Sequence, residues 1–355
     1  MASAGLLGAV LLAVGALCLG SGCSTLAYYG QALNGHLDLL RSARPVQDWS
    51  ADPATPPALR ERLLLSQRMR DFAVRALKLP DNASYRSYAD LNRSAAVWNA
   101  VAAPELGLAL KTWCFPVLGC VGYRGYYSRE PAEALATELR SQGWETSVYG
   151  VPAYSTLGWS NWMGGDPLLN TFLNWSEGEL ARLIFHELAH QVAYADDDTT
   201  FNESFATAVE RIGGRLWLQQ HGSEQARAHD ALLQLRREDF RAFTLRWRAE
   251  LDALYKSDLS DPLKRSRKAE LMARMRAEYV PLKAARWDGF AGYDGWFEGA
   301  NNASFAVQAA YNELVPDFER LFEASGNNFD RFYREVQRLA ALPKDERRAK
   351  LKASN

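Results

Sequence analysis

The sequence contains few histidines and cysteines, the side chains that most often bind metals. Its 355 residues include five histidines and four cysteines, and the formal net charge is -1 at pH 7. A near-neutral chain gives no electrostatic reason to expect nucleic acid as a partner. Internal repeats and low-complexity tracts are also absent. The remaining composition is ordinary for a globular protein, 48% apolar and 23% charged, and the length allows one large domain or two.

The first residues lack charge altogether. Residues 1–22 carry no charged side chain, and an apolar run extends from Leu6 to Leu19. A run of this length is short for a membrane span but suits the core of a signal peptide. The small residues before Cys23 resemble a bacterial lipoprotein signal, in which the cysteine is lipidated. The missing Lys and Arg, and Gly20 in place of leucine, depart from that pattern, and an uncleaved signal anchor is the alternative.

From this pattern we expect residues 1–22 to be a lipoprotein signal peptide. The mature chain, 23–355, would then be lipid-anchored in the bacterial cell envelope and face the periplasm. We interpret it as a single domain with a helical part (26–80), a part with the sheet and the active-site helices (84–220), and a C-terminal helical part (223–345).

Two of the four cysteines lie in the export segment, and the other two are only six residues apart. Cys114 and Cys120 flank Pro116 and Gly119, which favour a turn between them. In an oxidising periplasm, a disulfide closing this short loop is expected. The alternatives are two free buried cysteines or a second zinc site, although no histidine lies nearby.

Hydrophobic periodicity predicts a mainly helical chain with a few strands. We expect helices over 26–45, 57–78, 130–142, 201–220, 223–255 and 261–279. We expect strands over 95–103, 119–127 and 145–154. Between residues 262 and 286, eight Lys and Arg accompany two Glu. We interpret these cations as a solvated helix face, with contact to an anionic surface as the alternative.

The most informative motif is the HExxH segment formed by His186, Glu187 and His190. On a helix, a four-residue spacing places both imidazoles on one face, one turn apart, where they can share a zinc ion. Ser176 is the expected N-cap of this helix, with Glu179 three residues later to close a capping box. The motif therefore predicts a zinc hydrolase.

Two histidines do not complete a catalytic zinc site, which typically has three protein ligands and a position for water. Glu203 offers a carboxylate thirteen residues after His190, at the start of the next predicted helix. Its other interpretation is a first-turn glutamate favoured by the helix dipole. With one zinc ion bound, Glu187 would take a proton from the attacking water and pass it to the leaving amine.

Supporting roles around the metal have several candidates. Each histidine ligand needs an acceptor for its second ring nitrogen. Glu210 lies two turns beyond Glu203 on the same helix face, and the acidic loop 196–198 offers other carboxylates. Tyr154 and Tyr311 are candidates for contacting the substrate or the developing oxyanion.

Several stretches together resemble a bacterial family of predicted zinc aminopeptidases, gluzincin-like and of lipoprotein type. The resemblance extends from Tyr28 to about Phe322 and includes the HExxH helix and Asn202-Glu203. Other stretches that carry it are Val97-Trp98-Asn99, Trp113-Cys114-Phe115-Pro116, Tyr123-Arg124-Gly125-Tyr126 and Ala153-Tyr154-Ser155-Thr156-Leu157-Gly158-Trp159.

The resemblance implies a zinc site on His186, His190 and Glu203, with Glu187 catalytic. It also implies an α+β, mainly helical, zincin-like metallopeptidase fold. We expect a small mixed sheet beside the HExxH helix and a long C-terminal helical hairpin. In gluzincins a strand just before that helix pairs with the peptide substrate, and residues 154–158 fit this position.

The sequence therefore predicts an aminopeptidase acting on peptides. An exopeptidase needs an acidic group for the free amine, and Glu105 and Asp166 are both candidates. The alternatives are a zinc endopeptidase on the same site, or a non-catalytic envelope lipoprotein that binds peptides. A membrane scaffold has support only from the anchor and the basic helix.

Overall fold

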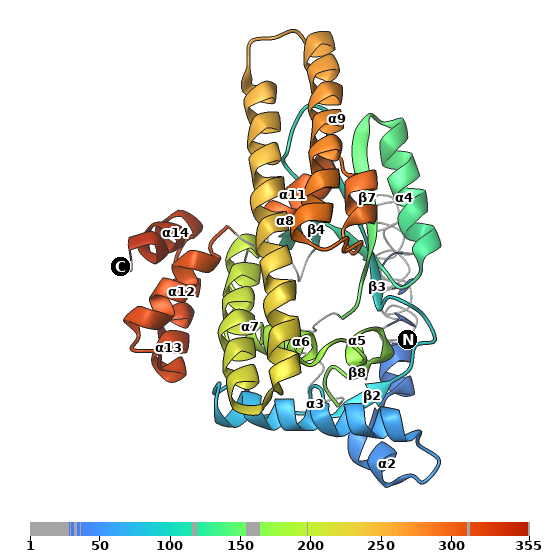
Figure 1. The fold of residues 1–355 in the computed structure, drawn as a ribbon, viewed down its shortest axis with the longest axis vertical. Coiled ribbons are helices and arrows are strands. Elements are labelled where there is room, and N and C mark those ends of the chain that lie inside the picture. The colour runs from blue at the N-terminus through green and yellow to red at the C-terminus, as the bar shows by residue number, and fades with distance from the viewer. Residues whose placement is uncertain are drawn as a thin grey trace, which may run out of the picture.

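The computed structural model describes residues 28, 30–31, 34–35, 37–115, 119–153, 164–196, 198–310 and 313–353. These residues are mainly helical with small mixed sheets, as expected for the α+β class (Figure 1). Several features predicted from the sequence lie outside the described residues. These are the expected signal segment with Cys23, the segment 154–158, Asp197 and Tyr311. No helix among the described residues is both long enough and apolar enough to cross a membrane.

A three-stranded antiparallel sheet has helices on both faces. Strand β3 (Val97–Pro104) lies between β6 (Arg124–Tyr126) and β7 (Trp144–Val151). Successive side chains of β3 point to opposite faces. Ala100 therefore packs with Ala132 of α4 (Arg129–Ser141), whereas Val101 packs with Ala303 of α11 (Asn302–Ala310). The α11 face is the one that adjoins the candidate site described below.

Two further sheets are smaller. In one of them, β2 (Ser87–Ala89) pairs antiparallel with β1 (Arg44–Pro45) and parallel with β8 (Leu168–Leu169), which makes this sheet mixed. Strand β8 leads into α5 (Asn170–Leu173) and then into the helix that carries the HExxH motif. The other is a hairpin of β4 (Trp113–Phe115) and β5 (Gly119–Val121), which the Cys114–Cys120 disulfide joins.

The main hydrophobic core lies where helices far apart in the sequence meet. It includes residues of α3 (Pro57–Arg75), α6 (Glu177–Ala189), α7 (Thr199–His221), α12 (Val315–Ala324) and α13 (Phe329–Ala340). Gly213 and Gly214 let α6 and α7 approach closely, because a Cβ at Gly213 would meet the Phe185 ring at 2.9 Å. Helix α14 (Lys344–Ala353) packs beside α12 and α13.

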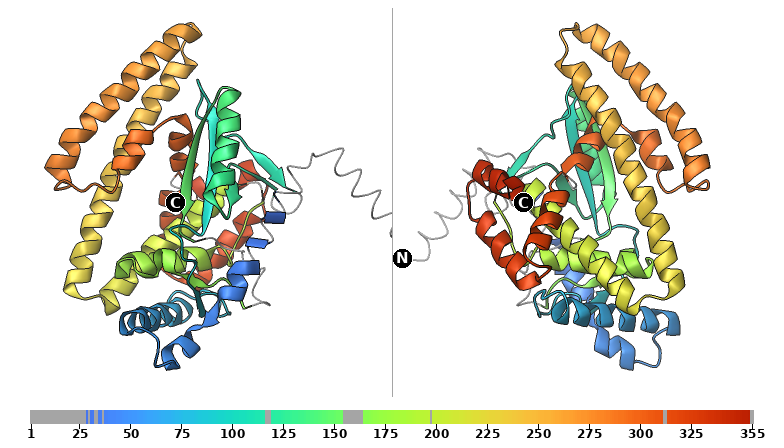
Figure 2. Two further views of the ribbon diagram at one scale, coloured as in Figure 1. Left: turned by 90° about the vertical axis from the view of Figure 1, so that its right-hand side faces the viewer. Right: turned by 60° about the vertical axis from the view of Figure 1, so that its left-hand side comes forward.

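The long helical hairpin of α8 (Glu224–Lys256) and α9 (Asp261–Arg286) stands away from the body (Figure 2). It has a separate aromatic core that includes Trp247 and Tyr279 and extends to α10 (Asp294–Gly299). The sequence predicts the end of the second hairpin helix at Tyr279, but α9 continues through Pro281 to Arg286. A proline removes one hydrogen bond from a helix, and packing against α8 and α10 offsets that loss.

The N-terminal part differs from the single helix expected over 26–45. Residues 37–42 are helical, but Arg44 and Pro45 form β1, and a short helix α2 (Val46–Ala51) follows directly. Burial of Val46 and the pairing of β1 with β2 override the helical periodicity of this segment.

Candidate metal centre

The HExxH residues lie at the end of a buried helix. Leu180, Ile184 and Leu188 recur on the side of α6 that packs into the main core, and all three are fully buried. His186 lies in the last turn of this helix, and His190 is its C-cap with near-helical backbone angles. Both imidazoles consequently project from the same end of α6, one turn apart.

The capping box predicted for α6 is wrong. Ser176 is the N-cap, but its hydroxyl makes no capping hydrogen bond, and Glu179 instead accepts from the Arg237 guanidinium of α8. The glutamate is thus used in a contact between helices that are distant in the sequence.

The loop after His190 returns the chain so that Glu203 faces the histidines. Asp198 caps α7 by accepting from the Phe201 N–H. The buried Asn202 amide both accepts from the Ala195 N–H and donates to its carbonyl, at 2.8 and 2.9 Å. These bonds fix the loop between the helices and place Glu203 just beyond the first turn of α7.

Three donor atoms converge between α6 and α7. The His186 and His190 Nε2 atoms are 3.2 Å apart. The Glu203 Oε2 atom lies 3.4 Å from the first and 3.7 Å from the second. Among the described residues, these three form the one group of histidine, cysteine and acidic side chains that could hold a metal ion.

Glu210 lies where the sequence predicts it, behind the first histidine. The His186 Nδ1–H donates to Glu210 Oε2 at 3.0 Å, which leaves Nε2 facing His190 and Glu203. For His190 no such acceptor is present within the described ranges, where its buried Nδ1 has no hydrogen-bond partner. The two imidazoles are therefore held differently: a carboxylate orients the first through Nδ1, whereas the second has no such bond at Nδ1 among the described residues.

Burial and mutual charge shift the pKa of every group at the centre. Burial lowers the pKa of His190 to about 4. Burial opposes protonation of His186 too, but its bonds with Glu203 and Glu210 raise its pKa well above the usual value. For Glu203, burial raises the carboxyl pKa, but His190 and His186 outweigh it and lower the pKa overall. For Glu210, burial also raises the pKa, but His186, Arg237 and Arg182 outweigh it.

Glu187 is buried beside the ligand group. Burial raises the pKa of its carboxyl to about 7, and the charge of His186 lowers it in part. The charges of Glu203, Asp166 and Glu210 raise it further. Asp166, one of two candidates for amine recognition, thus lies near enough to Glu187 to act on it electrostatically. The other, Glu105, accepts from Arg265 of α9 on the exposed surface.

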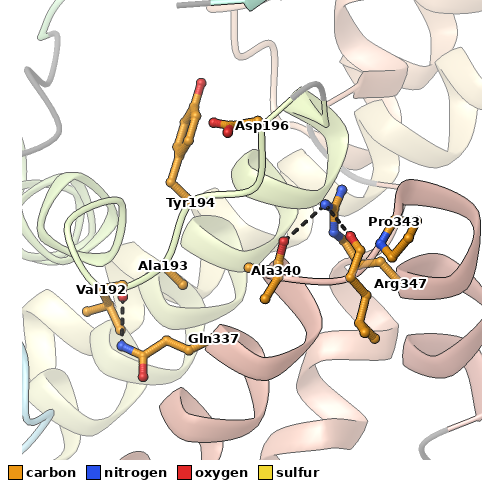
Figure 3. A pocket seen from close by; sticks show the side chains of 10 residues that line it. Val192, Ala193, Tyr194, Asp196, Gln337, Ala340, Pro343 and Arg347 are labelled. Carbon is orange, nitrogen blue, oxygen red and sulfur yellow. Dashed lines mark hydrogen bonds between the residues drawn. The ribbon is translucent and has the colours of Figure 1, made fainter.

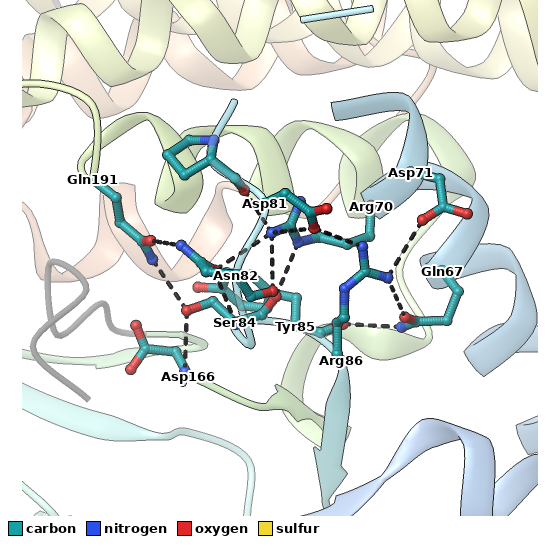
Figure 4. Close-up of polar contacts among 11 residues, drawn as sticks. Gln67, Arg70, Asp71, Asp81, Asn82, Ser84, Tyr85, Arg86, Asp166 and Gln191 are labelled. Carbon is teal, nitrogen blue, oxygen red and sulfur yellow. Dashed lines mark hydrogen bonds and ion pairs between the residues drawn. The ribbon is translucent and has the colours of Figure 1, made fainter. Parts of the chain in front are cut away.

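The buried side of this region contains a polar network around the segment 80–86 (Figure 4). Gln191, which follows His190, donates to Ser84 Oγ and accepts from the Asn82 amide. Ser84 Oγ also accepts from the Asp166 N–H. Arg70 of α3, fully buried, donates to the Ser84 carbonyl and so holds this segment in place. The network ties the residue after the motif to Asp166.

Asp198 does not act as an acceptor for the histidines, as the acidic-loop alternative would require. Its carboxylate accepts from Arg347 and Arg348 of α14 as well as from Phe201, and it is fully buried. Asp196 is exposed. Asp197 cannot be placed, since it is outside the described residues. The buried Asp198 therefore joins α7 to α14.

Two tyrosines near Glu203 are not among the sequence candidates. Tyr123 precedes β6 and Tyr149 lies in β7, both on the α11 face of the sheet. Burial raises the pKa of both, and the charge of Glu203 raises each further. The candidates Tyr154 and Tyr311 are outside the described residues. Alternation along β7 could have indicated Tyr149, but only the fold brings Tyr123 to Glu203.

Cavities lie on two sides of the loop between α6 and α7. The larger, about 620 Å³, lies between residues 192–196 and the connection from α13 to α14 (Figure 3). Two of its polar side chains are already paired: Gln337 donates to the Val192 carbonyl, and Arg347 donates to the Ala340 and Leu342 carbonyls. The smaller cavity adjoins Tyr123 and Tyr149.

The family model described as "Putative aminopeptidase" matches residues 27–351 of this chain. The chain belongs to this family. The match covers both helices of the metal centre, the sheet with Tyr123 and Tyr149, and the long hairpin. No curated protein and no solved structure matches the chain. Membership agrees with the aminopeptidase family expected from the sequence and indicates a hydrolase acting on peptides.

Proposed function

We propose that this protein is a zinc-dependent peptidase that removes N-terminal residues from peptides. The spacing of the three donor atoms carries the proposal. Ligands about 2.0–2.1 Å from a tetrahedral zinc ion lie roughly 3.3–3.4 Å from one another. The separations of 3.2, 3.4 and 3.7 Å among His186, His190 and Glu203 fit that triangle. Two imidazoles and one carboxylate also form a donor set that suits zinc, and its placement on two packed helices supports a zincin-like interpretation of the fold.

Each residue of the centre has a proposed role. His186, His190 and Glu203 would hold the ion, and Glu210 orients His186 through Nδ1. A bound zinc ion supplies Lewis acidity, which polarises a carbonyl group and lowers the pKa of water. Glu187, which is not part of the donor triangle, accepts the proton from the attacking water. It then gives that proton to the departing amine.

Hydroxyl groups on the sheet side complete the site. Tyr123 and Tyr149 stay protonated at neutral pH because burial and the charge of Glu203 raise the pKa of both. Each can therefore donate a hydrogen bond to the oxygen on which negative charge develops. We assign recognition of the substrate amine to Asp166, because it lies near Glu187 whereas Glu105 pairs with Arg265.

We further propose that Cys23 is lipidated and that the protein faces the periplasm from the cell envelope. The uncharged segment 1–22 supports this, and so does the Cys114–Cys120 disulfide, because disulfides persist in oxidising compartments.

The test combines metal analysis of the purified protein with hydrolysis of matched peptides that have free or acetylated amino termini. We expect about one zinc ion per chain and cleavage of the free peptides only. Glu187→Gln should keep the zinc and lose roughly 10²-fold or more in turnover, whereas Glu61→Gln, an exposed position on α3, should change neither. Cleavage of acetylated peptides would indicate an endopeptidase. Absence of both zinc and turnover would contradict the proposal and favour a peptide-binding lipoprotein.

A further inference from the structure

The turn that follows the HExxH helix is held from two sides. His190 is the C-cap of α6, and the next two residues both bond to elements distant in the sequence. The Gln191 side chain bonds to the segment 80–86. The Val192 carbonyl accepts from Gln337 of α13 at 2.9 Å (Figure 3). The backbone directly after the second candidate ligand is therefore fixed by two contacts.

The Gln191 amide makes a hydrogen bond at each end (Figure 4). Its oxygen accepts from Asn82 Nδ2 at 2.6 Å, and its nitrogen donates to Ser84 Oγ at 3.2 Å. Because an amide is planar and both its oxygen and its nitrogen are paired, these two bonds fix its orientation as well as its position. A half-buried side chain next to the motif is thus anchored to another part of the chain.

The segment that receives Gln191 is itself held in place. Arg70 is fully buried, and its guanidinium donates to the carbonyls of Pro80, Asn82 and Ser84, at 2.6, 3.2 and 3.0 Å. The Asn82 side-chain oxygen also accepts from the Ser84 N–H at 3.0 Å. A guanidinium has several donors in a fixed plane, so three carbonyls around it are held in one arrangement. The Gln191 amide therefore bonds to a preformed partner.

The two candidate histidine ligands differ in what holds them. Glu210 accepts from His186 Nδ1, whereas His190 Nδ1 has no hydrogen-bond partner among the described residues. Metal ligands depend on such outer contacts for their orientation. His190 is only 8% exposed, so packing restricts its ring once its backbone is fixed. The contacts of its chain neighbour Gln191 fix that backbone.

We propose that Gln191 is a positioning residue for the candidate metal centre. Its bonds to the segment 80–86 hold the backbone of His190 and so keep His190 Nε2 beside the other two donor atoms. Gln337 adds a second, more exposed bond to the same turn. The inference rests on the proposed function, because it requires that the three donor atoms bind zinc. A shift of this turn moves one corner of the donor triangle, and zinc then binds less tightly.

The test measures zinc affinity directly, by competition with a chromophoric chelator, and needs no peptide substrate. Methionine is similar in length to glutamine but cannot replace its two hydrogen bonds. We expect Gln191→Met to weaken zinc binding by about tenfold or more. Gln67→Met is the matched control and should keep the wild-type affinity. Gln67 is also half-buried and donates to the Tyr85 carbonyl at 2.9 Å, but it lies on α3 and not beside His190.

Further measurements distinguish positioning from a general loss of stability. Thermal unfolding of the metal-free variants reports on folding separately from zinc affinity. Gln337→Met should weaken zinc binding by less than Gln191→Met, because its bond is exposed to solvent. In a His190→Ala background, Gln191→Met should cause no further loss of zinc affinity, since the ligand that it positions has been removed.

The outcomes separate this inference from the function on which it rests. Unchanged zinc affinity in Gln191→Met, or an equal loss in Gln67→Met, overturns the inference and leaves the zinc site intact. A loss that persists in the His190→Ala background also overturns it, because Gln191 would then act on the site without acting through His190. A wild type that binds no zinc contradicts the proposed function, and this inference with it.

Discussion

The helix pair that carries the candidate metal ligands and the long hairpin differ in how they are held. In α6, nine of 13 residues are buried, whereas in α8 only four of 33 are. The ligand helices lie within the main apolar core, and the hairpin has a small aromatic core of its own. The difference teaches that the residues of the centre are fixed by close packing, while the hairpin is largely a solvated arm.

Two ion pairs connect these regions. Arg182 of α6 binds Asp230 of α8 through two hydrogen bonds, and Arg237 of α8 binds Glu179 of α6. Burial raises the pKa of Glu210, and His186 lowers it. The charges of Arg237 and Arg182 lower this pKa further, by smaller amounts. Through Arg237, the hairpin therefore acts on the centre by its charge.

The largest expected effect comes from breaking the buried connection. Arg182→Met leaves the Asp230 carboxylate buried without its partner and should lower the free energy of unfolding by about 3–5 kcal/mol, measured in urea. The double variant Arg182→Met/Asp230→Leu should regain most of the loss. Arg246→Met removes an exposed pair with Glu278 within the hairpin and should cost less than about 1 kcal/mol. Equal losses of unfolding free energy in Arg182→Met and Arg246→Met would contradict the contrast between the packed helix pair and the solvated hairpin.

A matched leucine pair sharpens the contrast in packing. Leu180 in α6 is fully buried, whereas Leu245 in α8 is 43% exposed. Leu180→Ala should cost about 3 kcal/mol because it leaves a cavity in the main core, and Leu245→Ala should stay within about 0.5 kcal/mol of wild type. Urea unfolding of both variants measures this, and a similar cost at the two positions would show that the hairpin is packed as the core is.

The close approach of α6 and α7 can be tested with a single methyl group. A Cβ at Gly214 would lie 2.7 Å from Arg182 Cγ, whose guanidinium Asp230 holds in place. Gly214→Ala should therefore cost about 1–3 kcal/mol from overpacking. Gly295→Ala, in α10, meets open space and should be neutral or slightly stabilising. Thermal unfolding compares the two, and a neutral Gly214→Ala would show that the helices can separate.

The smallest expected effect is a pH dependence at Asp198. Burial alone would raise the pKa of its carboxyl, but Arg348, Phe201 and Arg347 lower it below the ordinary 3.8. A lowered folded-state pKa contributes stability above the unfolded value, and this contribution is lost as pH falls below about 3.8. Asp198→Asn should therefore have a lower free energy of unfolding than wild type at neutral pH. The difference between the two proteins should become smaller as the pH falls. A gap that stays constant from pH 7 to pH 3 would contradict this.

What the sequence predicts well is what local periodicity controls. The start expected for the HExxH helix, and the bounds expected for β3 and for α8, agree with the structure to within a few residues, because burial on one face follows a regular spacing. The position of Glu203 near His190 follows from a short loop between two helices. The position of Glu210 is also predicted by helical spacing, because it lies two turns beyond Glu203 on the same helix face.

What the sequence could not predict depends on partners distant along the chain. Glu179 suits a capping box but pairs with Arg237, 58 residues away. Asp198 lies in an acidic loop, and the side chains of such loops are typically solvated. In the structure it is buried and accepts hydrogen bonds from two arginines of α14. Tyr123 is brought to the centre only by the pairing of β6 with β3. In each case a long-range contact prevails over the local preference.

The pairing of Asp198 with Arg347 also has a consequence for the order in which the protein folds. The two residues are 149 positions apart, and closing so large a loop is slow because its entropy cost precedes any gain. We expect the start of α7, just before Glu203, to be among the last parts to become protected. Pulsed hydrogen exchange would then show late protection at the Phe201 amide and early protection at Ile184. A newly synthesised chain would thus form α6 before the three candidate metal ligands come together.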